Sequence, residues 1–216
     1  MRLRIDLAYD GGGFFGWAKQ PTIRTVQGEI ERVLHVAFRL AMSRRRKLTV
    51  VDKANVLETS RLWRETAQRI AREYPDVAVD FMFVDNAAMQ IIRQPAYFDV
   101  IVTENMFGDI LTDEASVISG SLGMLSSASV GAEVALFEPI HGSYPQAAGK
   151  NIANPMATIL SAAMLLEHLG LDAEGKAVRH AVDKALAEGV VTEDLVASGE
   201  KACSTSEVGD YVAANV

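Results

Sequence analysis

The run Asn105-Met106-Phe107-Gly108-Asp109-Ile110-Leu111-Thr112-Asp113-Glu114 places two carboxylates four residues apart in an otherwise apolar, helix-like stretch. In a helix, Asp109 and Asp113 lie one above the other on a single face. Like charges so placed repel each other, and a divalent cation bound by oxygen ligands would remove that cost. A solvated acidic face explains the pair equally simply, so the rest of the chain has to decide between the two interpretations.

Strand-like runs alternate with helical stripes around this stretch. The patterns predict strands at 2–7, 48–51, 77–84, 99–103 and 134–137, and helices at 25–42, 56–74, 105–118, 155–168, 172–188 and 206–214. A small-residue loop is predicted at 120–131, and Asp85 stands where a helix would start, a good N-cap position. Strands that alternate with helices predict an α/β fold with a largely parallel sheet.

The composition is that of a globular chain. Of the 216 residues, 49% are hydrophobic and 23% are charged, and the net charge of -7 disfavours binding to nucleic acid. The basic cluster Arg44-Arg45-Arg46-Lys47 is interpreted as a solvated helix end, with a phosphate or nucleic-acid patch as the alternative. The single cysteine, Cys203, excludes an intrachain disulfide. Without a membrane-length apolar run or a signal-peptide pattern, we expect a cytoplasmic protein.

Three further segments carry candidate site residues. Lys53 comes just after the run 48–51 and Asp85 just after 77–84, and the ends of strands are where open α/β sheets build their sites. The loop 138–155, which contains His141, is too long for a plain turn and is typical of binding loops. Each segment also has an ordinary explanation, namely a surface lysine, a helix cap and a surface loop.

From about Arg32 to Val216, the chain resembles the 3-isopropylmalate dehydrogenases of the isocitrate/isopropylmalate dehydrogenase family. The blocks that carry the resemblance are 51–58 (VDKANVLE), 107–116 (FGDILTDEAS), 138–143 (EPIHGS), 148–155 (AGKNIANP) and 204–210 (STSEVGD). Together these blocks are highly specific. The version Asp52-Lys53-Ala54-Asn55 favours the isopropylmalate branch over the isocitrate branch.

The resemblance implies an oxidoreductase of leucine biosynthesis that uses NAD and Mg²⁺ or Mn²⁺ to decarboxylate a 3-isopropylmalate-like 2-hydroxy acid oxidatively. It also implies a homodimer with shared active sites. By this resemblance, Asp109 and Asp113 of one subunit bind the metal together with Asp85 of the other, and Lys53, also from the other subunit, is the general base and proton relay. Asn55 and Val56 match positions near the substrate and the nicotinamide. The residues that match the loop around the adenosine half of NAD are His141, Gly142, Ser143 and Asn154.

Gln146 departs from the pattern of that family. Members that prefer NAD often carry Asp at this position, where a carboxylate accepts hydrogen bonds from both ribose hydroxyls. An amide at Gln146 does so less strongly, so the resemblance favours NAD over NADP without deciding between them.

The first 31 residues resemble a different family. Arg4-Ile5-Asp6-Leu7-Ala8-Tyr9-Asp10-Gly11, Gly16-Trp17 and Arg24-Thr25-Val26-Gln27-Gly28-Glu29 are similar to the opening of the tRNA pseudouridine synthase A family. The catalytic Arg-Thr-Asp-Ala-Gly motif of that family is absent from the sequence. We therefore expect a chimera, with a strand-turn-helix segment at 1–31 and a partial isopropylmalate-dehydrogenase-like sheet flanked by helices at 32–216.

Members of the dehydrogenase family are far longer, and the resemblance does not include their front half. That half supplies arginines for the substrate carboxylate, a catalytic tyrosine and part of the nicotinamide pocket, so we expect an impaired dehydrogenase. The alternatives are a catalytically inactive chimeric remnant and an RNA-modifying protein related to the pseudouridine synthases. The acidic composition and the missing motif disfavour the second alternative.

Overall fold

The computed structural model describes residues 12–131, 133–196 and 199–216, so the predicted strand 2–7 lies outside the described residues. The chain forms two compact units, which divide between Glu114 and Ala115. The predicted boundary between residues 31 and 32 falls inside the continuous helix α1 (Val26–Ser43). That boundary concerns the ancestry of two segments, and it stays a prediction. In the part of the chain that the structure describes, no helix is both long and apolar enough to cross a bilayer.

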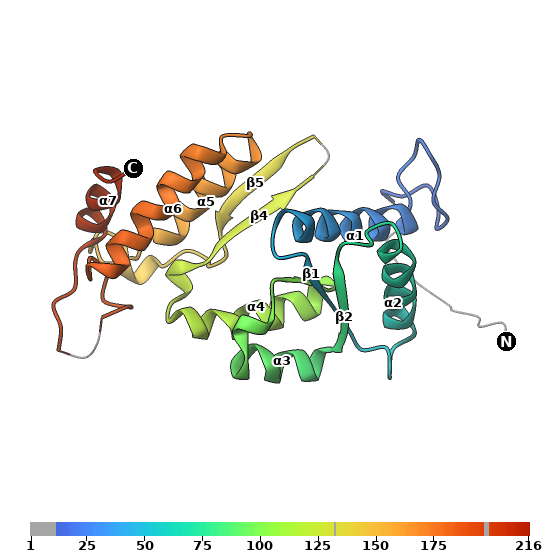
Figure 1. Ribbon diagram of the computed structural model, residues 1–216. Coiled ribbons are helices and arrows are strands. Elements are labelled where there is room, and N and C mark those ends of the chain that lie inside the picture. Colours follow the sequence, from blue (N-terminus) through green and yellow to red (C-terminus); the bar gives the residue numbers. More distant parts are fainter. Residues whose placement is uncertain (1–11, 132, 197–198) are drawn as a thin grey trace. The chain divides into compact units, whose positions relative to one another are not determined.

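The first unit is a three-stranded parallel sheet with helices on both sides (Figure 1). The strand order is β2-β1-β3, so the central strand β1 pairs with both neighbours. A strand in this position is buried on both faces, and all its residues after Lys47 are buried. In chain order, the first unit consists of α1 (Val26–Ser43), β1 (Lys47–Asp52), α2 (Glu58–Ala71), β2 (Ala78–Phe83), α3 (Val84–Arg93), the 3₁₀ turn η1 (Pro95–Tyr97), β3 (Val100–Val102) and the first turns of α4 (Asn105–Ser119).

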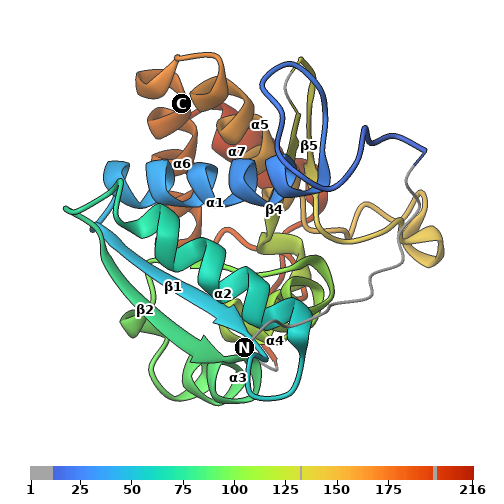
Figure 2. The same cartoon turned by 90° about the vertical axis from the view of Figure 1, so that its right-hand side faces the viewer.

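The core of this unit lies between the sheet and the helices α1 and α2, while α3 lies on the other side of the strands (Figure 2). The ring of Phe38 stacks on that of Tyr74 with 4.8 Å between their centroids. Each large apolar side chain buried here contributes about 1.5–3 kcal/mol, so packing holds the two helices on the sheet. The fully buried members of the core are Leu34, Phe38, Ala41, Leu48, Val50, Ala67 and Ile70.

The second unit is a β-hairpin covered by helices. Strands β4 and β5 pair antiparallel, α5 lies against both of them, α6 packs on α5, and α7 packs on α6 (Figure 1). Its core contains the buried side chains of Met156, Val182 and Val208. After the end of α4, the elements are the 3₁₀ turn η2 (Leu122–Met124), β4 (Ser126–Val130), β5 (Ala135–Pro139), the 3₁₀ turn η3 (Pro145–Ala147), α5 (Met156–His168), α6 (Asp172–Ala187) and α7 (Thr205–Ala213).

Two local predictions are wrong. The segment 120–131 is not a plain loop, because it contains η2 and β4; pairing with β5 makes a strand of serines and alanines with low strand propensity. Asp85 is not an N-cap, because α3 already begins at Val84 and the Asp85 carboxylate accepts a hydrogen bond from Lys53 instead. The other predicted elements within the described residues are present, and the largest shift is at α2, which ends at Ala71 rather than at Tyr74.

The basic cluster Arg44–Lys47 is bound to the segment that precedes β3. The Arg44 Nε atom lies 2.9 Å from Oδ1 of the buried Asp99, whose Oδ2 accepts from the backbone N–H of Arg45 at 2.9 Å. The Nζ atom of Lys47 donates to the carbonyl of Tyr97 at 2.7 Å. These bonds favour the interpretation of the cluster as a helix end.

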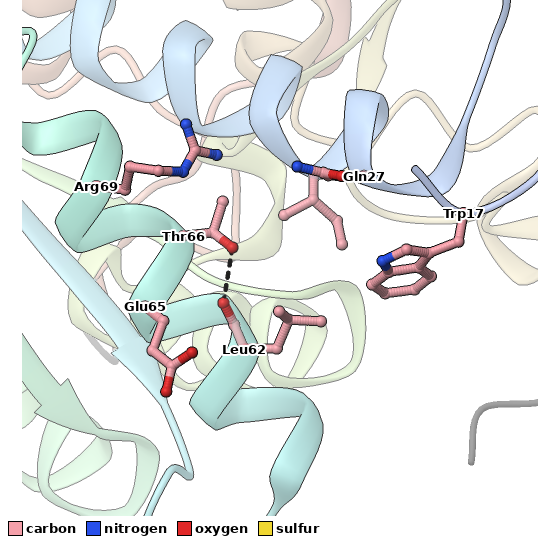
Figure 3. Close-up of a pocket in the computed structure, with 7 residues that line it drawn as sticks. Trp17, Gln27, Leu62, Glu65, Thr66 and Arg69 are labelled. Carbon is pink, nitrogen blue, oxygen red and sulfur yellow. Dashed lines mark hydrogen bonds between the residues drawn. The ribbon is translucent and has the colours of Figure 1, made fainter. Parts of the chain in front are cut away.

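Glu31 connects three parts of the first unit. Its carboxylate, 4% exposed, accepts hydrogen bonds from Lys19 at 2.6 Å, Gln27 at 3.0 Å and Arg69 at 2.5 Å. Beside it, Trp17 of the segment before α1 faces α2 across a pocket of about 330 Å³ (Figure 3). Burial alone would raise the pKa of Glu31, but the hydrogen bonds from Lys19 and Gln27 and the charge of Arg69 outweigh it and lower the pKa.

We expect Glu31→Gln to lower the free energy of unfolding of this unit by about 1–3 kcal/mol at neutral pH, because three donors lose a charged acceptor. A carboxyl group whose pKa is lower in the folded than in the unfolded protein stabilises the folded state at pH values above its unfolded pKa, which is about 4.3 for a glutamate. This stabilisation is lost as the pH falls through the pKa of the folded state. Glu31→Gln should therefore also flatten the acid dependence.

Urea unfolding followed by tryptophan fluorescence measures this effect, because Trp17 and Trp63 both lie in the first unit. Glu65→Gln is the control, since Glu65 is an exposed glutamate of the neighbouring helix α2 in the same unit. Equal losses in the two variants would contradict the role of Glu31.

Candidate functional site

The carboxyl ends of the three parallel strands carry the first set of candidate residues. Lys53 directly follows β1, and Asp85 lies in the first turn after β2. Helix α4, with Asp109 and Asp113, follows β3. Because parallel strands end at the same edge of a sheet, the topology brings Lys53, Asp85 and the start of α4 to one edge, where open α/β sheets place their sites.

Lys53 and Asp85 form a direct ion pair. The Nζ atom of Lys53 lies 2.7 Å from Oδ1 of Asp85, and the side chains are 24% and 63% exposed respectively. The hydrogen bond from Lys53 holds the pKa of the Asp85 carboxyl below its usual value. The Lys53 backbone is also fixed, since its N–H donates to Ser60 Oγ at 3.0 Å. The structure therefore places an ammonium and a carboxylate together at an accessible edge.

A second ion pair, between Asp52 and Arg64, helps to fix the end of β1 directly before Lys53. Asp52, the last residue of β1, is 1% exposed and accepts two hydrogen bonds from Arg64 at 2.7 and 2.9 Å. Asp52 also accepts from the N–H of Ala54 at 2.9 Å, and the Arg64 guanidinium lies 4.9 Å from the ring centroid of Phe83. Arg64 was not among the candidates predicted from the sequence. The one sequence feature that could have indicated it is Asp52, a carboxylate at the end of a buried strand, because a buried carboxylate requires a counter-charge.

The three predicted metal ligands do not meet within one chain. Asp109 and Asp113 are both exposed on α4. The strand order puts β2, which precedes Asp85, and β3, which precedes α4, on opposite sides of β1. Among the described residues, no three His, Cys, Asp or Glu side chains gather where they could hold a metal ion. The contribution of Asp85 by a partner subunit stays a prediction. Asn55 and Val56 lie exposed in the turn after Lys53.

A pocket of about 620 Å³ in the second unit carries the other candidate set. Four of the five residues predicted to bind the cofactor line it, namely His141, Gly142, Ser143 and Asn154, whereas Gln146 is not among the lining residues. The remaining lining residues are Ser121, Leu122, Gly123, Tyr144, Ile152, Ala153, Glu193 and Asp194. The structure thus brings the loop 141–144 and Asn154 to one cavity, as a shared binding role requires.

Asp194 is a residue of this pocket that the sequence analysis missed. Its carboxylate accepts hydrogen bonds from the Ser121 hydroxyl, from Asn154 Nδ2 at 3.0 Å and from Thr192 Oγ1 at 2.5 Å. Burial would raise the pKa of Asp194, but these three hydrogen bonds outweigh it and lower the pKa. Asp194 is therefore ionised at neutral pH. Two of its donors, Ser121 and Asn154, come from distant positions in the sequence, so no local pattern marks the cluster.

Comparison with known proteins identifies the family to which the chain is similar. The sequence profile described as "Isocitrate/isopropylmalate dehydrogenase" matches residues 18–212. The chain is 55% identical over 208 residues to a 3-isopropylmalate dehydrogenase of Bacteroides fragilis, a match that covers 94% of this chain and 59% of that protein. It is 58% identical over 193 residues to a 3-isopropylmalate dehydrogenase of Shouchella clausii, covering 88% of this chain and 53% of the relative.

Solved structures show the same likeness. An isocitrate dehydrogenase of Methylococcus capsulatus matches with a TM-score of 0.82 at 41% identity, over 88% of this chain and 56% of the other. A β-decarboxylating dehydrogenase of Thermococcus kodakarensis matches with a TM-score of 0.80 at 36% identity, over 95% of this chain and 62% of the other. The chain thus spans 53–59% of the length of the two curated relatives above.

These matches bear on the predicted chimera only in part. The profile match begins at residue 18, before the predicted junction at residues 31 and 32. The resemblance of residues 1–31 to the pseudouridine synthase A family is not tested by these findings and stays a prediction. Residues 1–11, which include much of that resemblance, lie outside the described residues.

Gly123 provides a test of the pocket wall. A Cβ atom at this position would lie 2.6 Å from Cβ of Asn154, which is closer than two non-bonded carbon atoms can approach. We expect Gly123→Ala to push Asn154 aside and to destabilise the second unit by about 1–3 kcal/mol, the usual cost of overpacking.

Thermal unfolding followed by circular dichroism would measure this change. Gly142→Ala is the matched control, because a Cβ at Gly142 would meet no atom within 4 Å although it lines the same pocket. Equal melting temperatures for the two variants would show that the contact between Gly123 and Asn154 is not tight.

Proposed function

Because the chain belongs to the isocitrate/isopropylmalate dehydrogenase family, we propose that it serves the NAD- and metal-dependent oxidative decarboxylation of a 3-isopropylmalate-like 2-hydroxy acid in leucine biosynthesis. The observation that carries the proposal is the Lys53–Asp85 ion pair at the carboxyl edge of the parallel sheet. Identities of 55% and 58% to proteins named 3-isopropylmalate dehydrogenase favour this substrate class.

The chemistry of the donor set fits a hard divalent cation. Asp109 and Asp113 present carboxylate oxygens from one exposed stretch of α4, and Asp85 is accessible from outside the chain. Mg²⁺ and Mn²⁺ prefer such oxygen ligands. When bound, the ion would polarise the oxygens of the substrate as a Lewis acid.

Lys53 is the residue that we assign to proton transfer. Its Nζ atom already donates a hydrogen bond to Asp85 at 2.7 Å, so it can hold or pass a proton at this atom. Asp52 and Ser60 fix the backbone on both sides of Lys53 through the N–H groups of Ala54 and Lys53. The amine is therefore presented from a rigid strand end, and Asn55 and Val56 follow it toward the substrate side.

We assign the adenosine half of NAD to the pocket of the second unit. A volume of about 620 Å³ lies within the usual range for small-molecule sites. His141, Gly142, Ser143 and Asn154 line the pocket. The role of Gln146, which is not among the lining residues, stays a prediction.

The curated relatives are substantially longer than this chain, which covers 53% and 59% of two of them. We therefore propose that the 216 residues alone turn over substrate less well than those relatives. A catalytically inactive remnant remains the alternative to an impaired enzyme.

An activity assay separates these two possibilities. With isopropylmalate, Mg²⁺ and NAD, we expect slow formation of NADH, followed by absorbance, that stops when EDTA removes the metal. Asp109→Asn should lower the rate at least about 100-fold, because it replaces a charged oxygen ligand by a neutral amide. Glu174→Gln, an exposed change on α6, is the control. No turnover by the wild-type chain would favour the remnant.

We also propose a homodimer, in which Lys53 and Asp85 of one subunit complete the site of the other. For such a dimer we expect the predicted helices 56–74 and 105–118 to pair across a two-fold axis. Helices α3 and α4 expose apolar side chains that a second copy could cover, namely Met89, Ile92, Met106 and Ile110, each 55–63% exposed. Helix α2 gives less support, because the exposed positions Glu65, Gln68 and Arg69 are polar.

Light scattering tests the dimer. We expect twice the mass of the 23.4 kDa chain, and we expect Ile110→Glu to shift the population to the monomer because it would bury a charge in the interface. Val36→Glu is the matched control, as Val36 is an apolar residue of α1 that is 44% exposed. A monomeric wild-type chain would count against sites shared between subunits.

A further inference from the structure

The side-chain amide of Asn154 is held in one orientation by two partners. Its Oδ1 atom accepts a hydrogen bond from the N–H of Met156 at 2.9 Å, and its Nδ2 atom donates to Oδ2 of Asp194 at 3.0 Å. An N–H group can only donate and a carboxylate can only accept, so both partners select the same orientation of the amide. This leaves one hydrogen on Nδ2 and one lone pair on Oδ1 for a ligand in the pocket that Asn154 lines.

Asp194 itself is held from three directions. The backbone N–H of Gly123 donates to Ser121 Oγ at 2.9 Å, and the Ser121 hydroxyl donates to the same Oδ2 atom that binds Asn154. The buried Thr192 hydroxyl donates to Oδ1 at 2.5 Å. The carboxylate therefore cannot turn away from Asn154 without losing hydrogen bonds to residues of other segments.

Gly123 also limits the space around Asn154. Gly123 approaches so closely that a Cβ atom there would lie 2.6 Å from Cβ of Asn154. Steric contact thus limits the movement of the Asn154 side chain, and Asp194 and the N–H of Met156 together determine which way its amide faces.

We infer that Asp194 is a positioning residue, which fixes the Asn154 amide so that it offers a donor and an acceptor in a set order to the adenine of a bound nucleotide. An asparagine amide matches the adjacent donor and acceptor atoms of adenine, and the order of its two groups decides whether the match is made. Hypoxanthine carries an oxygen where adenine has its amino group, so a fixed amide discriminates between the two bases. The inference rests on the proposed nucleotide site and deepens it.

Calorimetric titration of the full chain with AMP and with IMP tests the inference. We expect the wild-type chain to bind AMP about tenfold more tightly than IMP. Asp194→Ala removes the acceptor of Asn154 Nδ2 and leaves the amide held by the N–H of Met156, so AMP should bind about tenfold more weakly and the preference for AMP should fall several-fold. A role in stability alone would not change the ratio between two ligands in the folded protein.

Asp194→Asn distinguishes hydrogen bonding from charge. Its carbonyl oxygen can replace Oδ2 toward Ser121 and Asn154, while the Thr192 hydroxyl rotates to accept from the new amide. We therefore expect Asn to preserve the AMP preference within about threefold. A loss as large as in Asp194→Ala would overturn the inference. Glu200→Gln is the control, because it removes an exposed charge of the same unit outside the pocket and should keep the ratio.

NMR of the Asn154 side-chain amide separates failure of the inference from failure of the proposed function. In the free protein, Asp194→Ala should shift the two Nδ2 proton resonances toward those of a solvated asparagine; unchanged resonances would overturn the inference. Absence of AMP binding to the wild-type chain would overturn the nucleotide site, and the NMR result would then decide whether Asp194 orients Asn154. If Asp194→Ala does not fold, Asp194→Ser, which is too short to reach Asn154, takes its place.

Discussion

The pairing of β1 with a parallel neighbour on each side is the constraint on which the first unit depends. A central parallel strand is buried on both faces, so helices must cover the sheet on both sides. The same pairing aligns the ends of three strands at one edge, where Lys53 and Asp85 meet although 32 positions separate them in the sequence. The topology therefore creates the accessible edge and the core together, and the candidate site follows from the packing of the sheet.

Buried carboxylates bind the helices and loops to this framework. Asp52 binds Arg64 of α2, Glu31 binds Lys19 and Arg69, and Asp99 binds Arg44. An unpaired buried charge is costly, so each of these acids requires a partner from another element. In the second unit, the exposed Asp194 accepts hydrogen bonds from neutral donors, namely Ser121 and Asn154 of other segments and Thr192, two positions before it. These contacts fix the register and orientation of the helices and loops relative to the strands, which apolar packing alone specifies less precisely.

The sequence predicted the elements better than the contacts between them. Periodicity located most of the described helices and strands, because burial imposes repeats of 3.6 and 2 residues on the chain. It failed at 126–130, where serine and alanine have little strand preference and only pairing with β5 forms the strand. Of the candidate site, the motif resemblance placed four cofactor residues that do line one pocket, while Arg64 and Asp194 escaped notice because their partners are distant in sequence.

The sequence by itself determined the family, the α/β class and the residue types available for chemistry at Lys53, Asp85, Asp109 and Asp113. These are properties of local pattern and of motif identity, which a linear chain displays directly. Only the tertiary structure decided that Lys53 and Asp85 are paired, that the strand order separates Asp85 from the helix that carries Asp109 and Asp113, and that Asp194 holds Asn154. Such facts depend on which strands are neighbours and on which distant donors reach a carboxylate, and both are set by packing in three dimensions.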